Sequence, residues 1–152
     1  KKNKTDIIII LTNHILKKKI INSPKLGVIN KHSSLLPALR GLFPYFWAKI
    51  YNLNNGITFH LVNDKIDDGK ILFQRELKKK FPSMISFYYY VFNKYPLFLL
   101  KSLTNIKKRR IYKFYYKSSY YSLPSKKNYM EFKKKDGNII LIKDIFNISN
   151  YF

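Results

Sequence analysis

The chain has 152 residues, of which 46% are hydrophobic; this is enough for one domain with a buried core and argues against a disordered chain. It contains no cysteine, so disulfides, thiolate catalysis and cysteine-based zinc sites are excluded. The formal net charge is +22, carried by 26 lysines and 4 arginines.

The first part of the chain predicts a strand, a helix and a second strand. Thr5–Leu11 is a continuous, mostly β-branched run, typical of a strand buried on both faces of a parallel sheet. Asn13 can cap a short helix that runs through Ile21, and Leu26–Asn30 forms a second strand that ends close to His32. A strand, a helix and a strand in this order predict a right-handed parallel crossover. Because the chain opens on a strand that needs neighbours on both sides, we also expect an N-terminal part of the sheet that this sequence does not include.

The rest of the chain predicts a hairpin and further helices. The expected elements, in order, are a loop over Ser33–Pro44, a helix around Tyr45–Tyr51, strands at Gly56–Val62 and Lys70–Leu77, a helix over Pro82–Ile106 that is kinked or split at Pro96, and a weak strand at Asn138–Ile142. The turn Asn63–Gly69 joins the two strands and places Asp67 and Asp68 at the tip of the hairpin.

Three polar side chains at turn-flanked strand ends, Asn30, His32 and Asp67, are the candidate catalytic residues. Ligands of open α/β sheets bind beyond the carboxyl ends of the strands, which is where Asn30 and His32 fall. An amide can donate a hydrogen bond to an oxyanion, and an imidazole can carry a proton. A neighbouring carboxylate can orient the imidazole and raise its pKa. Acyl transfer through a tetrahedral intermediate needs this combination.

The order and spacing of short motifs extend this interpretation. The segments are Ile29–Pro37 (INKHSSLLP), Arg40-Gly41 with Pro44, Gly56–His60 (GITFH) and Ile66–Gly69 (IDDG) followed by Ile71. They resemble the catalytic domain of the 10-formyltetrahydrofolate-dependent formyltransferases, a family that includes enzymes formylating methionyl-tRNA, glycinamide ribonucleotide and nucleotide-linked amino sugars. The resemblance implies a partial Rossmann-like α/β fold: a mostly parallel sheet, a β-hairpin that carries the catalytic Asp67, and a helical C-terminal segment. Residues 1–106 would form the catalytic core without its N-terminal half-sheet, and residues 107–152 a basic, tyrosine-rich extension.

The resemblance also implies a role for each matching position. Asn30 would steady the formyl oxygen as it becomes an oxyanion, His32 would manage the protons, and Asp67 would orient the histidine or a bound water. Arg40 and His60 would support the loop. The pocket for the folate donor would be formed by Ile15, Leu16, Lys65, Ile66, Asp68 and Gly69.

Simpler interpretations compete at several other positions. His60 lies within a strand, where a packed side chain is the commoner case, and His14 lies near a helix start, where it would face solvent or the edge of the pocket. The three histidines lack the spacing of metal ligands, so no metal site is expected. Asp64 lies in a turn, where aspartate is favoured in any case.

The sequence therefore predicts a transferase that moves a formyl group from 10-formyltetrahydrofolate to a primary amine: a small or sugar-linked amine, or aminoacyl-tRNA. One alternative is a hydrolase that gives the formyl group to water, and another is a truncated, non-catalytic relative that binds folate or a polyanion. The charge favours RNA only weakly, because nucleic-acid surfaces usually rely on arginine and AT-rich codons would also give this lysine content. No membrane partner is expected and a cytoplasmic location is predicted, while the oligomeric state stays open.

Overall fold

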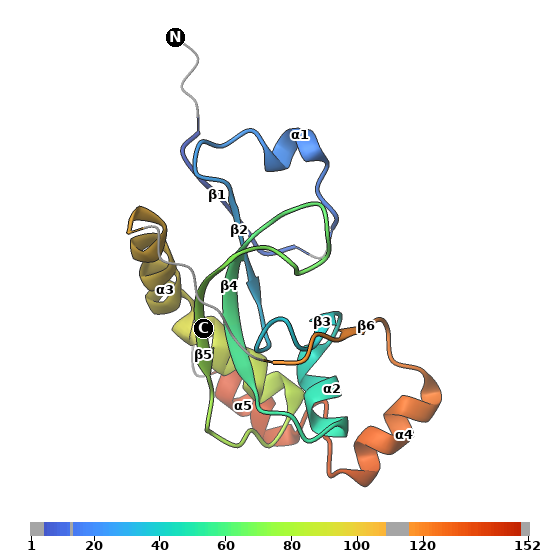
Figure 1. Cartoon of the computed structure of the whole chain (residues 1–152). Helices are drawn as coiled ribbons and strands as arrows, with labels where there is room; N and C mark the ends of the chain where they lie inside the picture. The colour runs from blue at the N-terminus through green and yellow to red at the C-terminus, as the bar shows by residue number, and fades with distance from the viewer. Residues whose placement is uncertain (1–4, 13, 109–115, 150–152) are drawn as a thin grey trace.

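The computed structural model describes residues 5–12, 14–108 and 116–149 (Figure 1). Its elements in chain order are β1 (Ile8–Ile10), α1 (Lys18–Ile21), β2 (Val28–His32), β3 (Arg40–Gly41), α2 (Pro44–Ile50), β4 (Gly56–Leu61), β5 (Ile71–Glu76), α3 (Met84–Lys107), β6 (Tyr120–Tyr121), α4 (Lys126–Lys134) and α5 (Ile142–Ser149). No helix in these described ranges combines the length and the hydropathy needed to span a bilayer.

The main sheet has the strand order β1-β2-β4-β5. β1 and β2 are parallel and joined through α1, as the expected crossover requires, whereas β4 runs antiparallel to β2 and β5 antiparallel to β4. The direction of β4 follows from α2, which lies near the carboxyl end of β2, so that β4 starts from that end and returns along β2 (Figure 1). The α/β class and the hairpin are confirmed, and the described sheet is mixed, with one parallel pairing and two antiparallel ones.

Two predicted elements are shorter than expected, and one is of the wrong type. β1 covers Ile8–Ile10 only, and α1 begins at Lys18, with Asn13, the expected cap, outside the described residues. The weak strand predicted at 138–142 is wrong: the carbonyls of Asn138 and Ile139 accept hydrogen bonds from the first amides of α3, at 2.8 and 3.0 Å. That backbone is used to cap a helix and is not available to extend a sheet.

Helix α3 is continuous through Pro96, so of the predicted kink or split at this residue the split is wrong. Proline removes one amide donor, and the carbonyl that loses its partner belongs to Phe92, a residue that is 53% exposed and so lies on the outer side of the helix. At the N-terminus of α3, the Ser83 side chain caps the helix by accepting a hydrogen bond from the Ser86 amide at 2.9 Å. One lost hydrogen bond is therefore tolerated within 24 residues of helix.

Helix α3 covers one face of the sheet and leaves the other face for polar side chains. Phe59 of β4 and Phe73 of β5 point to the α3 face, where their rings lie 5.4 Å from Tyr95 and 5.3 Å from Phe98. Because side chains alternate along a strand, the neighbours of Phe59, namely Thr58 and His60, point to the opposite face.

The C-terminal segments pack against the core. β6 pairs in parallel with β3 in a second, two-stranded sheet. Phe132 of α4 is fully buried and stacks on Phe46 of α2, with ring centroids 4.4 Å apart. At α5 the buried carboxylate of Asp144 accepts a hydrogen bond from the Ser83 hydroxyl at 2.6 Å, which ties this helix to the start of α3.

Candidate active site

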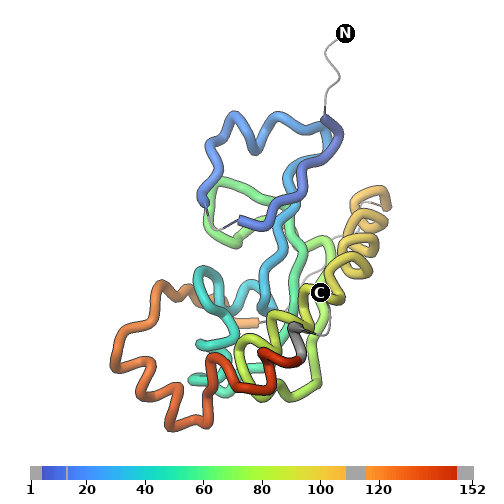
Figure 2. The backbone as a smooth tube through the Cα atoms, turned by 180° about the vertical axis from the view of Figure 1, so that it is seen from behind, coloured from blue at the N-terminus to red at the C-terminus, as the bar shows by residue number. Residues whose placement is uncertain are grey.

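A cavity of about 540 Å³ lies along the C-terminal half of β2. Seen from behind, the segment around α1 and the turn between β4 and β5 lie side by side, and both contribute to the cavity wall (Figure 2). The lining includes the predicted catalytic residues Asn30, His32 and Asp67. A volume of this size lies in the range of small-molecule and cofactor sites.

Strand pairing brings the polar side chains together on one face. Asn30 and His32 are two residues apart on β2, so they share a face. The antiparallel register pairs Asn30 with His60 and His32 with Thr58 on β4. Four polar residues therefore gather on the side of the sheet away from α3.

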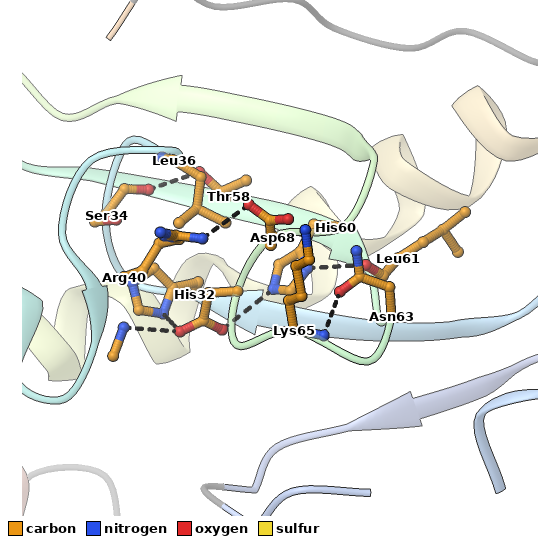
Figure 3. Close-up of polar contacts among 12 residues, drawn as sticks. His32, Ser34, Leu36, Arg40, Thr58, His60, Leu61, Asn63, Lys65 and Asp68 are labelled. Atoms are coloured by element: carbon orange, nitrogen blue, oxygen red, sulfur yellow. Dashed lines mark hydrogen bonds and ion pairs between the residues drawn. The ribbon is translucent and has the colours of Figure 1, made fainter. Parts of the chain in front are cut away.

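Thr58 fixes the start of the loop that follows β2. Its hydroxyl donates to the Ser34 carbonyl at 2.6 Å and accepts from the Leu36 amide at 3.2 Å (Figure 3). The side-chain amide of Gln74 donates to the same hydroxyl at 2.8 Å. Because Thr58 is fully buried, this network holds the loop that leads from His32 towards β3.

The imidazole of His32 is held at both ring nitrogens. Nε2 lies 2.7 Å from the Leu39 carbonyl oxygen, which can only accept, so Nε2 carries a proton. Nδ1 lies 3.4 Å from Oδ2 of Asp67. The neutral ring therefore presents an unprotonated Nδ1, and the protonated ring would have an acceptor at each nitrogen.

Burial has the largest effect on the pKa of His32 and lowers it. Asp67 and the Leu39 carbonyl raise the pKa, while the nearby His60 and Lys31 lower it further. The net pKa of His32 lies below 6.5. The sequence-based expectation of a raised pKa is correct for the contribution of Asp67 and wrong for the sum, because the ring is buried. The neutral imidazole is thus the resting form near pH 7.

Asp67 lies in the turn between β4 and β5 with a left-handed backbone, φ +48°. Its Oδ2 accepts a hydrogen bond from the Gly41 amide at 3.0 Å, and its Oδ1 lies 3.5 Å from Nε2 of His60. Burial alone raises the pKa of Asp67. The nearby His60 side chain, the charge of His32 and the Gly41 amide outweigh burial and lower the pKa to about 2. Asp67 is therefore ionised at neutral pH and can stabilise a proton on either histidine.

His60 contributes more to the site than the sequence indicated. It is 2% exposed, as expected of a packed side chain, and its Nδ1 donates to the Leu61 carbonyl at 3.0 Å (Figure 3). Its other nitrogen faces Asp67. The available signal was a histidine in a mostly apolar strand, but only the register with Asn30 places it at the site. In the described part of the chain, no group of three or more His, Asp or Glu side chains is placed to hold a metal ion.

Arg40 and Asp68 form an ion pair beside the predicted catalytic residues. Nη1 of Arg40 lies 2.8 Å from Oδ1 of Asp68 (Figure 3). This pair joins β3 to the β4–β5 turn, the same two segments that the Gly41–Asp67 hydrogen bond joins. It therefore supports the position of the turn.

The predicted donor-binding residues separate into two groups. Ile15, Leu16, Lys65 and Ile66 line the cavity, whereas Asp68 and Gly69 are not part of its lining. Among the lining residues that the sequence did not indicate are Lys31, Phe92 of α3 and Tyr120 of β6. They come from the far side of β2 and from distant parts of the chain, where no local motif marks them.

Residues 1–80 match the model of the family described as formyl transferase. The chain belongs to the formyl transferase family. It is 48% identical over 77 residues to the methionyl-tRNA formyltransferase of Wigglesworthia glossinidia brevipalpis, a match that covers 49% of this chain and 24% of that protein. It is 45% identical over 65 residues to the bifunctional polymyxin resistance protein ArnA of the same organism, covering 42% of this chain and 10% of that protein.

The chain spans about a quarter or less of the length of these curated relatives. Among solved structures, the chain is similar to the formyltransferase PseJ from Anoxybacillus kamchatkensis, with a TM-score of 0.67 at 24% identity over 85% of this chain and 70% of that one. The PseJ structure is a complex with UDP-4,6-dideoxy-4-formamido-L-AltNAc and tetrahydrofolate. Phosphoribosylglycinamide formyltransferase from Bacillus halodurans has a TM-score of 0.57 at 20% identity, over 69% and 56%. These likenesses show a shared fold, and the family resemblance seen in the motifs is confirmed.

Proposed function

We propose that this chain carries the catalytic centre of a formyltransferase that moves a formyl group from 10-formyltetrahydrofolate to a primary amine. The observation that carries the proposal is the arrangement of His32, with a fixed acceptor at each ring nitrogen, beside Asn30 in one cavity. All three predicted catalytic residues lie within the segment that matches the family.

The chemistry of the cavity suits a donor with a flat, partly apolar ring system. Ile15, Leu16 and Ile66 line it, and Ile15 is 78% exposed, so it has apolar surface that a bound ring could cover. Tetrahydrofolate is present in the PseJ structure, and 5-N-formyl-tetrahydrofolate in that of the sugar 3N-formyltransferase WlaRD, which is 25% identical to this chain. The donor supplies the activated formyl group.

The residues of the chain would perform the remaining steps. As the amine nitrogen bonds to the formyl carbon, the formyl oxygen gains negative charge and the side-chain amide of Asn30 donates a hydrogen bond to it. Nδ1 of His32 takes the proton that the amine releases, and Asp67 stabilises the resulting imidazolium. The same proton passes to N10 of the donor as the bond between that nitrogen and the formyl carbon breaks. The products are a formamide and tetrahydrofolate.

The acceptor is proposed only as a class of compound, namely a primary amine. Sugar N-formyltransferases and methionyl-tRNA formyltransferases are both among the similar proteins, so an amine on a sugar nucleotide and an aminoacyl-tRNA are the substrates to compare.

The test combines donor binding with turnover. Calorimetry with a stable 10-formyltetrahydrofolate analogue should give saturable binding to the parent chain and to Asn30→Ala, whereas transfer by Asn30→Ala should fall on the order of 10²–10³-fold. His32→Ala should abolish transfer while its circular dichroism spectrum stays that of the parent. Full activity of His32→Ala would refute the assignment. Formate release without an amine would identify a hydrolase, and absence of donor binding would indicate a non-catalytic relative.

A further inference from the structure

The loop that follows β2 and the short strand β3 each present a backbone group to the predicted catalytic residues. The Leu39 carbonyl holds Nε2 of His32, and the Gly41 amide holds Oδ2 of Asp67. The φ angles of Leu39 and Gly41 are +60° and +95°, in the left-handed region. For leucine this conformation is unfavourable, so the loop depends on contacts outside itself to stay in place.

Those contacts come from a segment far along the chain. The Leu39 amide donates to the Ser119 hydroxyl at 2.9 Å, across a sequence separation of 80 residues. The Arg40 amide donates to the Ser119 carbonyl at 2.9 Å, and the Ser119 amide donates to the Pro37 carbonyl at 3.2 Å. Leu39 is thus bound to Ser119 through its amide and to His32 through its carbonyl.

The next residues of this segment continue the pairing. The Leu42 amide donates to the Tyr121 carbonyl at 3.0 Å, and β6 lies beside β3 (Figure 1). A Cβ atom on Gly41 would overlap the Tyr121 carbonyl, so the close approach requires glycine. The two backbones are therefore in direct contact where the loop reaches Asp67.

Segment 119–121 is itself anchored to a helix. The ring of Tyr121 stacks on Trp47 of α2 and on Tyr51, which directly follows this helix, with centroids 4.8 and 5.2 Å away. Trp47 is 5% exposed, so the anchor is part of the core. The segment can therefore transmit the rigidity of α2 to the loop.

We infer that segment 119–121 is a positioning clamp for His32 and Asp67, and that Ser119 is its key positioning residue. The role in catalysis rests on the proposed function. Ser119 touches no reacting atom: its hydroxyl accepts from the Leu39 amide, and its carbonyl accepts from the Arg40 amide, which shares a peptide group with the Leu39 carbonyl that binds His32. The family match ends at residue 80, so the clamp comes from outside the matched segment.

The test compares Ser119→Ala with Ser119→Thr, which retains a hydroxyl, and with Ser118→Ala, which alters an exposed neighbour. Ser119→Ala should lower kcat roughly tenfold with unchanged donor affinity, since small misplacements of catalytic groups are costly. Ser119→Thr should recover most of the rate, and Ser118→Ala should behave as the parent. An unchanged kcat in Ser119→Ala, or an equal loss in Ser118→Ala, would overturn the inference.

A second measurement needs no activity. His32 faces Asp67, His60 and Lys31 in every variant. Ser119→Ala removes the hydroxyl that fixes the Leu39 amide, so it can affect His32 only through the position of the adjoining Leu39 carbonyl. Nitrogen NMR of the ring should show a lower pKa for His32 and a less fixed Nε2 proton in Ser119→Ala. An identical titration in Ser119→Ala and the parent would refute the clamp. If the parent catalyses no transfer, the proposed function fails, while this titration still tests the clamp.

Discussion

Replacing Asp67 by asparagine separates the charge of the carboxylate from its shape. Asparagine has the same size, keeps an oxygen for the Gly41 amide and tolerates the left-handed φ of +48°. The substitution therefore removes mainly the attraction between the carboxylate and the imidazoles of His32 and His60.

The expected magnitude follows from the pKa. Asp67 titrates at about 2, against an ordinary value of 3.8, and each pKa unit corresponds to about 1.4 kcal/mol. The ionised side chain, which is 11% exposed, should thus contribute about 2 kcal/mol to the free energy of unfolding. Because the pKa is lowered in the folded state, this stability is present above pH 3.8 and is lost as the pH falls through about 2.

Urea unfolding followed by the fluorescence of Trp47, the single tryptophan, provides the assay. Asp67→Asn should be less stable than the parent by about 2 kcal/mol from about pH 4 up to the pH at which His32 loses its proton, and the two stabilities should converge towards pH 2. The control Asp68→Asn removes a neighbouring carboxylate that is 34% exposed and should cost less than about 1 kcal/mol. A gap between parent and Asp67→Asn that stays constant with pH would refute the reasoning, as would an equal effect in the control.

Three further predictions concern the surroundings of the site. Burial lowers the pKa of Lys31 to about 8. Between about pH 8 and pH 10.5 the unfolded chain therefore binds more protons than the folded one, and the free energy of unfolding should rise with pH. Urea unfolding of Lys31→Met should lack this rise. Thr58→Val leaves the buried Ser34 carbonyl and Leu36 amide unpaired and should cost about 3 kcal/mol in denaturant unfolding, whereas a neutral result would show that water replaces the hydroxyl. Gly69→Ala places a Cβ atom against the Leu61 carbonyl and should cost at least about 2 kcal/mol, and a thermal melt that matches the parent would contradict the packing of this turn.

Local patterns in the sequence were sufficient for much of the fold. The hairpin of β4 and β5 and the span of α3 follow from apolar periodicity and turn residues, which act over a few positions. The segment at 138–142 was predicted wrongly because its carbonyls cap α3, a contact across more than fifty residues that no local pattern reveals.

The sequence by itself determined which residues to consider at the site, because the motif that contains Asn30 and His32 and the turn that contains Asp67 are short and contiguous. Only the tertiary structure decided how they act. Burial reverses the expected shift in the pKa of His32, strand register brings His60 to Asp67, and Ser119 reaches the Leu39 peptide from 80 residues away. Each of these depends on solvent exclusion or on contacts between distant segments, which arise only when the whole chain packs.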